Sequence, residues 1–464
     1  SHLWGQSAST TESTLREELR DPAIRIAAIG VAGEQRVRFA TISNEGRHAG
    51  RGGVGAVMGA KNLKAIALRG NCRVRVADPR GVDALADALR TRSLSSVTAK
   101  YRELGTVANL SVFNRLGVLP TRNFQHSTFE REDQISGETL TVNHFSRMHG
   151  CASCTIRCER LFKAISGDEQ RLEYETLFAL GSLCGIENAE VVLHAAQLCD
   201  QYGLDTISTG GTIAWAMECA EKGLLPEATS FGLRFGNGEA LLKIIPAIAH
   251  RTGIGELLAE GSKRAATHIG GEALALAMHV KGMELPGYEP RGLKTMALGL
   301  AVSPRGACHN RSGAYEADFS GQVDRLRAEA SRGGLVAASE DFAAVLDSLS
   351  VCKFLRKCCE DFYAETARLL GVVTGWNFSA TEVRQIGERI NTVKKLFNQR
   401  EGWQPQDDWL PPRLLSEPLP SGVAQGVSLT PAELRVMIQG YYNARGWDEN
   451  GFVPAEKQQE LNLT

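Results

Sequence analysis

Long hydrophobic runs are missing from this 464-residue sequence. No apolar stretch approaches the ~20 residues that a membrane-spanning helix needs, and no signal peptide is visible. An excess of one charge is missing as well, because 52 Lys and Arg residues are matched by 53 Asp and Glu residues. The sequence therefore predicts no membrane span and gives no electrostatic reason to expect nucleic acid or acidic lipid as a partner. We expect a cytoplasmic protein.

Internal repeats of the solenoid type are also absent. The 11 cysteines are an odd number, and Cys199 and Cys219 lie in stretches that are predicted to be buried helix. These features do not fit the disulfide framework of a secreted protein. We therefore interpret the closely spaced cysteines as ligands in a reducing compartment.

The first part of the chain is predicted to be rich in β-strands. Alternation and β-branched residues predict one strand over residues 23–29 and a second over residues 37–43. In the segment 49–70, the order of residue types predicts a glycine-rich loop, a short helix and then a buried strand, LKAIAL.

Beyond residue 78 the pattern is mainly helical. Asp78 is a predicted N-cap, and a helix over 188–203 is predicted from its Asn cap to its terminal Gly. Capping boxes predict further helix starts at Ser379 and Thr430. The proline-rich segment 403–422 is predicted to be extended and to cross the surface.

Three cysteines lie close together in the segment HGCASCTIRCER, where Cys151, Cys154 and Cys158 follow a C-x2-C-x3-C pattern. Four thiolates bind either a tetrahedral zinc ion or a 4Fe-4S cluster. One tight loop plus one distant cysteine is typical of a cluster, whereas zinc more often uses a second close pair. Spacing therefore favours a cluster over zinc, with uninvolved thiols as a third interpretation and His149 as an alternative ligand. It does not choose the distant ligand among Cys184, Cys308, Cys352, Cys358 and Cys359.

Nine segments of the sequence, taken in order, resemble the aldehyde:ferredoxin oxidoreductase family. Any one of them is a weak signal, but the ordered set is specific. Members of that family carry tungsten, or sometimes molybdenum, on two pterin dithiolenes beside one 4Fe-4S cluster. The matching segments are AGRGGVGAVMGAKNLKAIALRG (49–70), LPTRNF (119–124), CASCTIRC (151–158), EYETLFALGSLCGI (173–186), CDQYGLDTISTG (199–210), GIGELLAEGSKRAA (253–266), MHVKGMELPGYEPRG (278–292), SPRGACHNR (303–311) and DSLSVCKF (347–354).

The resemblance implies an α+β fold. A partial N-terminal β-rich domain over residues 1–77 would form the base under the cofactor. Two mainly α-helical domains, over residues 78–279 and 280–464, would hold the cofactor at their interface. Family members also have a β segment before the position of SHLWG, which this sequence does not contain. We therefore expect a truncated product or one half of a split enzyme, whose missing segment another chain would supply.

The resemblance also selects Cys352 as the fourth cluster ligand. In the family this cysteine ends a D-x-x-G-L-C motif, which here runs from Asp347 to Cys352 with Ser and Val in place of Gly and Leu. The partner motif, D-x-x-G-L-D, is intact from Asp200 to Asp205. Buried carboxylates at these positions suit the amino and N–H donors along a pterin edge. The simpler alternative is that Asp200 and Asp205 only decorate a helix end.

The segment GRGGVG, residues 50–55, is implied to approach the pterin phosphates and a bridging Mg2+ through its backbone N–H groups. A dinucleotide site is not favoured, because the local order is helix then strand and the spacing is G-x-G-G-x-G. The implied cofactor-binding residues are Arg47, His48, Gly50, Arg51, Asp200, Leu204, Asp205, Arg305, Gly306, Arg311, Asp347, Val351 and Lys353.

The implied reaction is the oxidation of a small aldehyde to its carboxylic acid. Glu175 is implied as the general base and His309 as the donor to the carbonyl oxygen. As structural residues, Glu175 would instead form a salt bridge or cap, and His309 would pack in the core. Electrons would leave through the cluster to ferredoxin or an iron–sulfur electron-transfer subunit. A second copy of the chain, as a homodimer, is a further candidate partner.

Two alternatives share the same sequence features. One is an aromatic acyl-CoA reductase-type subunit of the same fold, which would differ in its pocket and partners. The other is a non-catalytic iron–sulfur electron-transfer subunit, which the altered motif at Asp347 mildly favours and the intact Glu175 and His309 disfavour.

Overall fold

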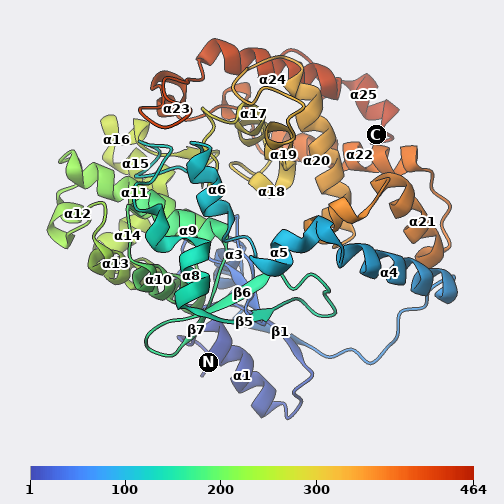
Figure 1. The fold of residues 1–464 in the computed structure, drawn as a ribbon, viewed down its shortest axis with the longest axis horizontal. Coiled ribbons are helices and arrows are strands. Elements are labelled where there is room, and N and C mark those ends of the chain that lie inside the picture. The colour runs from blue at the N-terminus through green and yellow to red at the C-terminus, as the bar shows by residue number, and fades with distance from the viewer. Residues whose placement is uncertain (1, 464) are drawn as a thin grey trace.

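The structure, a computed structural model, describes residues 2–463 and has the α+β architecture that the sequence predicted. Figure 1 shows the N-terminal sheet at the base of the molecule, the helices of the middle of the chain on one side and long C-terminal helices on the other. Helix α4 (Pro79–Ser93) lies beside α21 (Phe362–Thr374), although the two are far apart in sequence.

An antiparallel sheet with the strand order β3-β2-β1-β4 forms the base. Its register pairs Ile26 with Ala67 and Ser43 with His48. The predicted strand at 23–29 is confirmed as β1, and the predicted short helix as α3. The elements of this part are α1 (Ala8–Glu18), β1 (Arg25–Ala28), α2 (Val31–Glu34), β2 (Ile42–Asn44), β3 (Arg47–Ala49), α3 (Val54–Ala60) and β4 (Ala65–Leu68).

Two details of the strand prediction were wrong. Residues 37–41 do not form a strand, because their backbone groups form hydrogen bonds with the helical part of the chain. For example, the N–H of Thr41 donates to the carbonyl of Gly203. Only the end of that predicted strand enters the sheet, as β2. Strand β4 forms as predicted but lies at the sheet edge, where Leu68 is 66% exposed, and is therefore not buried.

The middle of the chain is mainly helical, as predicted. Asn188 caps α10 and Gly203 ends it with φ 77°, which confirms both predicted boundaries. Every residue of α11 from Ile207 to Ala220 is buried, so this helix forms the centre of its bundle. The helices are α4, η1 (Ser96–Thr98), α5 (Ala99–Glu103), α6 (Asn109–Arg115), α7 (Glu132–Ile135), α8 (Gly137–Asn143), α9 (Tyr174–Leu180), η2 (Ser182–Cys184), α10 (Ala189–Tyr202), α11 (Thr206–Glu221), α12 (Pro226–Phe231), α13 (Gly238–His250), α14 (Ile254–Leu258), α15 (Ser262–Ile269) and α16 (Glu272–Ala275).

Two small antiparallel sheets interrupt these helices and were not predicted. The first has the order β5-β6-β7, from β5 (Phe145–His149), β6 (Glu159–Lys163) and β7 (Glu169–Leu172). The second pairs β8 (His279–Val280) with β9 (Met283–Glu284). The first sheet matters for the site, because the loop between β5 and β6 carries the three clustered cysteines.

The C-terminal part contains the longest helices. The predicted capping boxes at Ser379 and Thr430 are both present, and each hydroxyl accepts the N–H of the glutamate three residues on. The elements are α17 (Lys294–Val302), α18 (His309–Ser312), α19 (Tyr315–Phe319), α20 (Arg332–Ser348), η3 (Lys353–Cys358), α21, α22 (Ala380–Arg400), η4 (Pro405–Asp407), α23 (Pro412–Ser416), α24 (Pro431–Arg445) and α25 (Ala455–Glu460).

The prediction of an extended surface crossing at 403–422 was wrong. Prolines in this segment begin the short helices η4 and α23, and Trp403 and Leu414 are buried. The guanidinium of Arg413 donates two hydrogen bonds, of 2.5 and 2.8 Å, to the carboxylate of Glu218 on α11. This buried pair anchors the segment in the interior, which proline content alone could not reveal.

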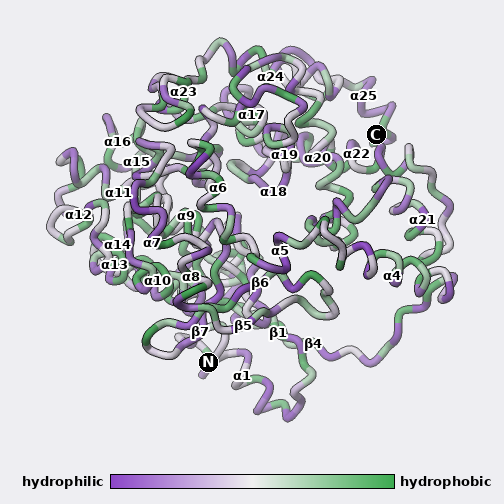
Figure 2. Tube along the Cα trace, viewed as in Figure 1, coloured by the Kyte–Doolittle hydropathy of each residue, from purple (hydrophilic) through white to green (hydrophobic). Residues whose placement is uncertain are grey.

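One large hydrophobic core runs from Ala32 to Val453 and includes residues of all three predicted domains. The domain boundaries after residues 77 and 279 therefore stay predictions. Figure 2 shows hydrophilic residues along the peripheral chain between β4 and α4 and along α25. No single helix within residues 2–463 has the length and apolar content to cross a membrane, and one bent pair, Tyr174–Cys184 with Ala189–Tyr202, passes that test jointly.

Candidate active site

A cavity of about 950 Å³ lies where α5, α6, α9, α19 and η3 meet the loop between β5 and β6. Both predicted catalytic residues, Glu175 and His309, line it. Cys151, Cys158 and Cys352 also line it, so residues from three distant parts of the chain share one wall. A neighbouring cavity of about 350 Å³ shares His309 with it and is enclosed by α18, α20 and η3.

Glu175 lies in the first turn of α9 and is buried. The N–H of Gly287 donates to its Oε2 at 3.0 Å, and the hydroxyl of the adjacent Tyr174 donates to the Gly287 carbonyl. Burial raises the pKa of Glu175 to about 7, although the Gly287 hydrogen bond and the charge of Arg51 act in the opposite direction. The carboxyl is therefore held in one orientation and exchanges its proton near neutral pH.

His309 begins α18 and places its Nδ1 3.4 Å from Oε1 of Glu175. Neither of these two buried atoms has a hydrogen-bond partner in the structure. Burial lowers the pKa of His309 well below its usual value, and the charges of Lys353 and Arg51 act in the same direction. The imidazole is therefore neutral at neutral pH, and the contact with Glu175 is not a pair of opposite charges.

Three of the four predicted cluster ligands, Cys151, Cys158 and Cys352, line this cavity, and the fourth, Cys154, lies in the same loop as the first two. Cys151, Cys154 and Cys158 lie in the loop between β5 and β6, and Cys352 precedes η3. Burial, together with the nearby charges of Glu173, Cys352 and Cys154, raises the pKa of Cys158 to about 12, while Arg47 acts in the opposite direction. All four thiols are free of disulfides.

The choice between a cluster and a single ion at these thiols stays a prediction. No group of three or more His, Cys, Asp or Glu side chains within residues 2–463 converges on one metal position. A 4Fe-4S cluster takes one thiolate per iron and so needs four separated sulfurs. His149, the alternative ligand, instead contacts Glu159 at 2.7 Å through Nδ1.

The first aspartate motif, from Asp200 to Asp205, contacts residues that are far away in sequence. Gly203 turns the chain so that Asp205 caps α11, where it accepts the N–H groups of Ile207 and Ser208 at 3.4 and 3.2 Å. Asp205 also lies 3.2 Å from Nε of Arg51. The motif therefore has a structural role besides its predicted one, and its Leu204 is buried.

Asp200, at the other end of this motif, contacts two side chains. Nε2 of His48 lies 3.1 Å from its carboxylate, and the amide of Gln170 donates to it at 2.8 Å. Burial alone would raise the pKa of Asp200, but His48, Arg171 and Gln170 together hold it below its usual value. Asp200 is therefore ionised, and sequence reasoning missed Gln170 on β7 because nothing in its local pattern marks it.

The glycine-rich loop packs tightly at one point. Gly53 has φ 70°, and a Cβ there would lie 2.1 Å from the carbonyl oxygen of Arg38, whereas Gly50 faces open space. Arg51 donates to the carbonyls of Ala307 and Glu284. Its guanidinium thus ties the loop to the helical part.

Arg47, which is also predicted to bind the cofactor, lies 2.7 Å from Glu159 and 3.6 Å from Glu173. Both arginines therefore have protein partners in this structure. Their assignment to the cofactor stays a prediction.

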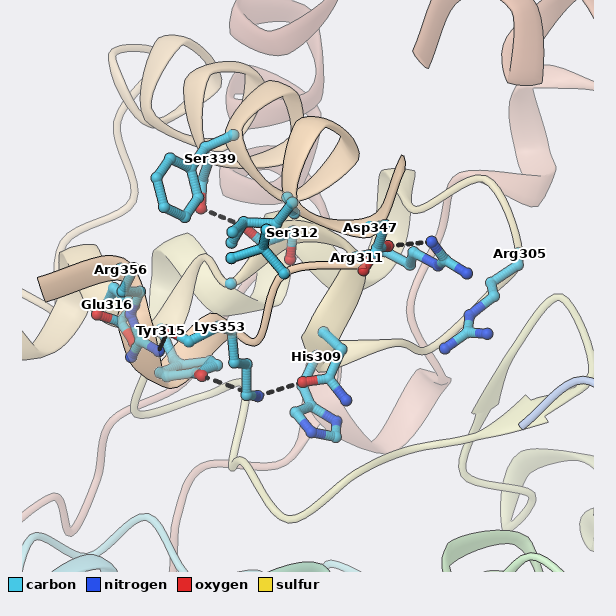
Figure 3. Close-up of a pocket in the computed structure, with 16 residues that line it drawn as sticks. Arg305, His309, Arg311, Ser312, Tyr315, Glu316, Ser339, Asp347, Lys353 and Arg356 are labelled. Carbon is cyan, nitrogen blue, oxygen red and sulfur yellow. Dashed lines mark hydrogen bonds and ion pairs between the residues drawn. The ribbon is translucent and has the colours of Figure 1, made fainter. Parts of the chain in front are cut away.

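The second aspartate motif lines the smaller cavity, which Figure 3 shows in close-up. Arg311 pairs with Asp347 across it. Lys353 donates to Asn310 and lies 3.4 Å from the hydroxyl of Tyr315. Val351 and Arg305 complete this wall.

Gly306 is the residue after Arg305 and has φ 103°. A Cβ there would lie 2.5 Å from the carbonyl oxygen of Val280 on β8. Nη2 of Arg305 lies 2.8 Å from Sγ of the buried Cys308. Cys308 therefore has a contact of its own and does not line either cavity.

An aromatic cluster lines the larger cavity and was not predicted. The ring of Tyr288 stacks on Tyr315 at 4.7 Å between centroids and lies 5.4 Å from the ring of His309. Phe113 stacks on Phe319 at 5.2 Å. Tyr288 falls in one of the matching segments, but Phe113 lies in α6 and nothing in its local sequence distinguishes it from an ordinary core residue.

The chain belongs to the aldehyde ferredoxin oxidoreductase family of oxidoreductases. The family profile described as the aldehyde ferredoxin oxidoreductase N-terminal domain matches residues 1–70. The profile described as domains 2 & 3 of the same enzymes matches residues 84–463. The two matches cover most of the chain and agree with the resemblance in the sequence.

Particular relatives are more informative. The chain is 39% identical over 480 residues to the tungsten-containing aldehyde ferredoxin oxidoreductase of Pyrococcus abyssi, which covers 100% of this chain and 77% of that protein. It is 31% identical to the aliphatic sulfonate oxidoreductase, WOR-like subunit, of Pyrococcus furiosus, over 94% of this chain and 69% of that protein.

A solved structure has the same fold. The active site complex BamBC of benzoyl coenzyme A reductase, in complex with 1,5-dienoyl-CoA, superposes with a TM-score of 0.81 and covers 100% of this chain and 77% of that one. The identity is 23%, so this likeness shows the fold alone.

Proposed function

We propose that this protein oxidises aldehydes to carboxylic acids and passes the electrons to ferredoxin or to an iron–sulfur subunit. One observation carries the proposal. Glu175 and His309 present unpartnered atoms 3.4 Å apart on the wall of a cavity that also carries Cys151, Cys158 and Cys352. The 39% identity to enzymes named tungsten-containing aldehyde ferredoxin oxidoreductases supports the choice of reaction.

The cofactor that fits this site is a tungsten, or molybdenum, centre on two pterin dithiolenes with a bridging Mg2+. The donor set fits it, since Arg305, Arg311 and Lys353 supply cationic donors beside the smaller cavity and Asp200 supplies an ionised acceptor. When bound, the metal takes up the two electrons that the oxidation releases. Cys151, Cys154, Cys158 and Cys352 would hold a 4Fe-4S cluster that releases those electrons one at a time.

Glu175 acts as the base for the water that becomes the second oxygen of the acid. Its pKa of about 7 makes the carboxylate available near neutral pH and still basic enough to accept the proton. The N–H of Gly287 holds one carboxylate oxygen and leaves Oε1, the unpartnered one, for the water. Overall, an aldehyde and one water give an acid, two electrons and two protons.

His309 is a neutral donor at the same wall. A neutral imidazole carries one N–H, which it donates to the carbonyl oxygen of the aldehyde as negative charge develops there. Tyr288, whose ring centroid lies 5.4 Å from that of His309, fixes the orientation of the imidazole. Lys353 follows Cys352 directly and contacts Asn310 and Tyr315, so the predicted fourth ligand is adjacent in sequence to a residue of the catalytic wall.

Replacement of Glu175 by Gln tests the proposal. The protein is purified anaerobically, and aldehyde oxidation is measured with ferredoxin or a viologen as acceptor. We expect turnover to fall about 100-fold or more, while iron content and the cluster signal in electron paramagnetic resonance stay unchanged. Glu239→Gln on α13, whose side chain is 87% exposed, is the matched control.

The same experiment separates the alternatives. A non-catalytic electron-transfer subunit would respond equally to both variants. An acyl-CoA reductase-type subunit would fail to oxidise aldehydes in the wild type. Stoichiometric zinc in place of about four irons would exclude the cluster.

A further inference from the structure

The charged groups on the wall of the larger cavity are not balanced. Its acidic residues have partners, since Glu173 lies 3.6 Å from Arg47 and Glu316 pairs with Arg356. Glu175 faces His309. Two further cations, Lys100 and Lys357, also line this cavity, and neither has a carboxylate within 4.0 Å in residues 2–463.

A contact between two aromatic rings joins the elements that carry these two lysines. Lys100 lies in α5 and Lys357 in η3. Tyr101 and Phe354, their near neighbours in sequence, pack in a tilted arrangement with ring centroids 4.1 Å apart and so hold α5 against η3. Burial lowers the pKa of Lys100 most, the charge of Lys357 acts in the same direction, and the charge of Glu138 acts in the opposite direction.

A neutral group holds Lys100 in place. Oδ1 of Asn109, the first residue of α6, accepts a hydrogen bond from Nζ at 2.6 Å. An amide oxygen orients the ammonium without neutralising it, so the positive charge stays available to a ligand. Two ammonium groups that line one cavity, with no carboxylate within 4.0 Å of either in residues 2–463, are a donor set for an anion.

The rest of the cavity lining between these lysines and the catalytic wall is largely apolar. Phe113, Val112 and Phe319 line it, with Tyr288 and Tyr315 beside His309. A volume of about 950 Å³ is at the upper end of the range for small-molecule sites. The cluster that Cys151, Cys158 and Cys352 would hold shares this space, so the volume alone does not set the size of the substrate.

We propose that the substrates are aldehydes that carry an anionic group, a carboxylate or a phosphate, at the end remote from the carbonyl. Lys100 and Lys357 bind that group, the aromatic wall packs the ring or chain, and the carbonyl lies at Glu175 and His309. This assignment rests on the proposed aldehyde oxidation. Both lysines line the cavity but are also exposed to solvent, so binding of a protein acceptor at them is one outcome of the test below.

Matched substrates test the proposal on the anaerobic holoenzyme. 4-Carboxybenzaldehyde and 4-formylphenoxyacetate carry a carboxylate at two distances from the carbonyl, and their methyl esters are neutral counterparts. 4-Formylphenyl phosphate, with 4-methoxybenzaldehyde as its neutral counterpart, distinguishes phosphate from carboxylate. At least one anion should have a KM about 5- to 10-fold below that of its neutral counterpart, and added salt should reduce the difference.

Variants locate the effect at the two lysines. In the Lys100→Gln/Lys357→Gln double variant, KM for the preferred anion should rise to that of the neutral counterpart, with kcat and the KM for the neutral substrate unchanged. Lys222→Gln, which removes an exposed lysine paired with Glu272, should change nothing. Equal KM values for anion and neutral counterpart in the wild type would overturn the proposal.

Two further outcomes are decisive. A double variant that raises only the KM for ferredoxin would place the lysines at the acceptor site instead. If the wild type oxidises none of these aldehydes, the proposed function fails, and calorimetric titration with 4-carboxybenzoate and its monomethyl ester then decides this inference alone. Tighter binding of the dianion that the double variant loses supports an anion site, and equal binding of both compounds refutes it.

Discussion

Glu175→Gln should change how the stability of this protein depends on pH. Burial raises the pKa of Glu175 to about 7 from 4.5, and its side chain is only 16% exposed. Because the folded state holds the proton more tightly than the unfolded chain, the stabilising contribution is complete below the unfolded pKa and is lost as the pH rises through about 7. That difference in pKa corresponds to about 3 kcal/mol at ~1.36 kcal/mol per unit.

The neutral amide of the variant has no such dependence. From ~pH 5 to ~pH 8, the free energy of unfolding of the variant should therefore rise relative to wild type by about 2 to 3 kcal/mol. Urea unfolding followed by tryptophan fluorescence measures this, with both proteins anaerobic and in the same cofactor state. Glu239→Gln should follow the wild-type curve, since that carboxylate is exposed.

Parallel curves for wild type and Glu175→Gln would refute the reasoning. They would mean that the carboxyl ionises at its ordinary pKa and that the apolar surroundings of α9 do not hold its proton. The physical basis for a base that works at neutral pH would then be lost, even if the variant were inactive.

Further predictions concern the glycine-rich loop and the cluster. Gly53→Ala should destabilise the protein by about 2 kcal/mol or more in chemical denaturation, because φ is 70° and the added Cβ meets a backbone oxygen, whereas Gly50→Ala should be nearly neutral. Cys352→Ser should lower the iron content and remove the cluster signal in electron paramagnetic resonance, whereas Cys359→Ser, outside the cavity, should do neither. Iron retained in Cys352→Ser would contradict the predicted ligand set.

Local signals in the sequence predicted the helix boundaries well. The caps at Asn188, Ser379 and Thr430 satisfy N–H groups of their own helices, so each depends on only a few neighbouring residues. The failures at 37–41 and 403–422 have the opposite cause. Those segments are fixed by partners such as Gly203 and Glu218, which lie far away in sequence, and no local periodicity reports such contacts.

The residues of the candidate site also differ in whether the local sequence could predict them. The three clustered cysteines were recognisable from their spacing, because a tight loop brings its own ligands together. Cys352 was not, since its approach to that loop depends on how η3 packs against α5. Only the resemblance to a family chose it over Cys184, which is buried and contacts Ala179 and Gly210.

Buried polar atoms in this molecule differ in whether they have hydrogen-bond partners. Arg445 is fully bonded, to Tyr441, Asp341, Glu340 and the carbonyl of Ala337, and such a network rigidifies its surroundings.

Around the larger cavity, by contrast, Oε1 of Glu175 and Nδ1 of His309 are buried without partners. An unpaired buried polar atom costs about 1 to 3 kcal/mol. Several occur elsewhere in the fold, including Oε1 of Glu340 beside Arg445, so their position on the cavity wall is what distinguishes Glu175 and His309. These two atoms lie 3.4 Å apart on the wall of the larger cavity, on elements that are distant in sequence, so a substrate in that cavity can reach both of them.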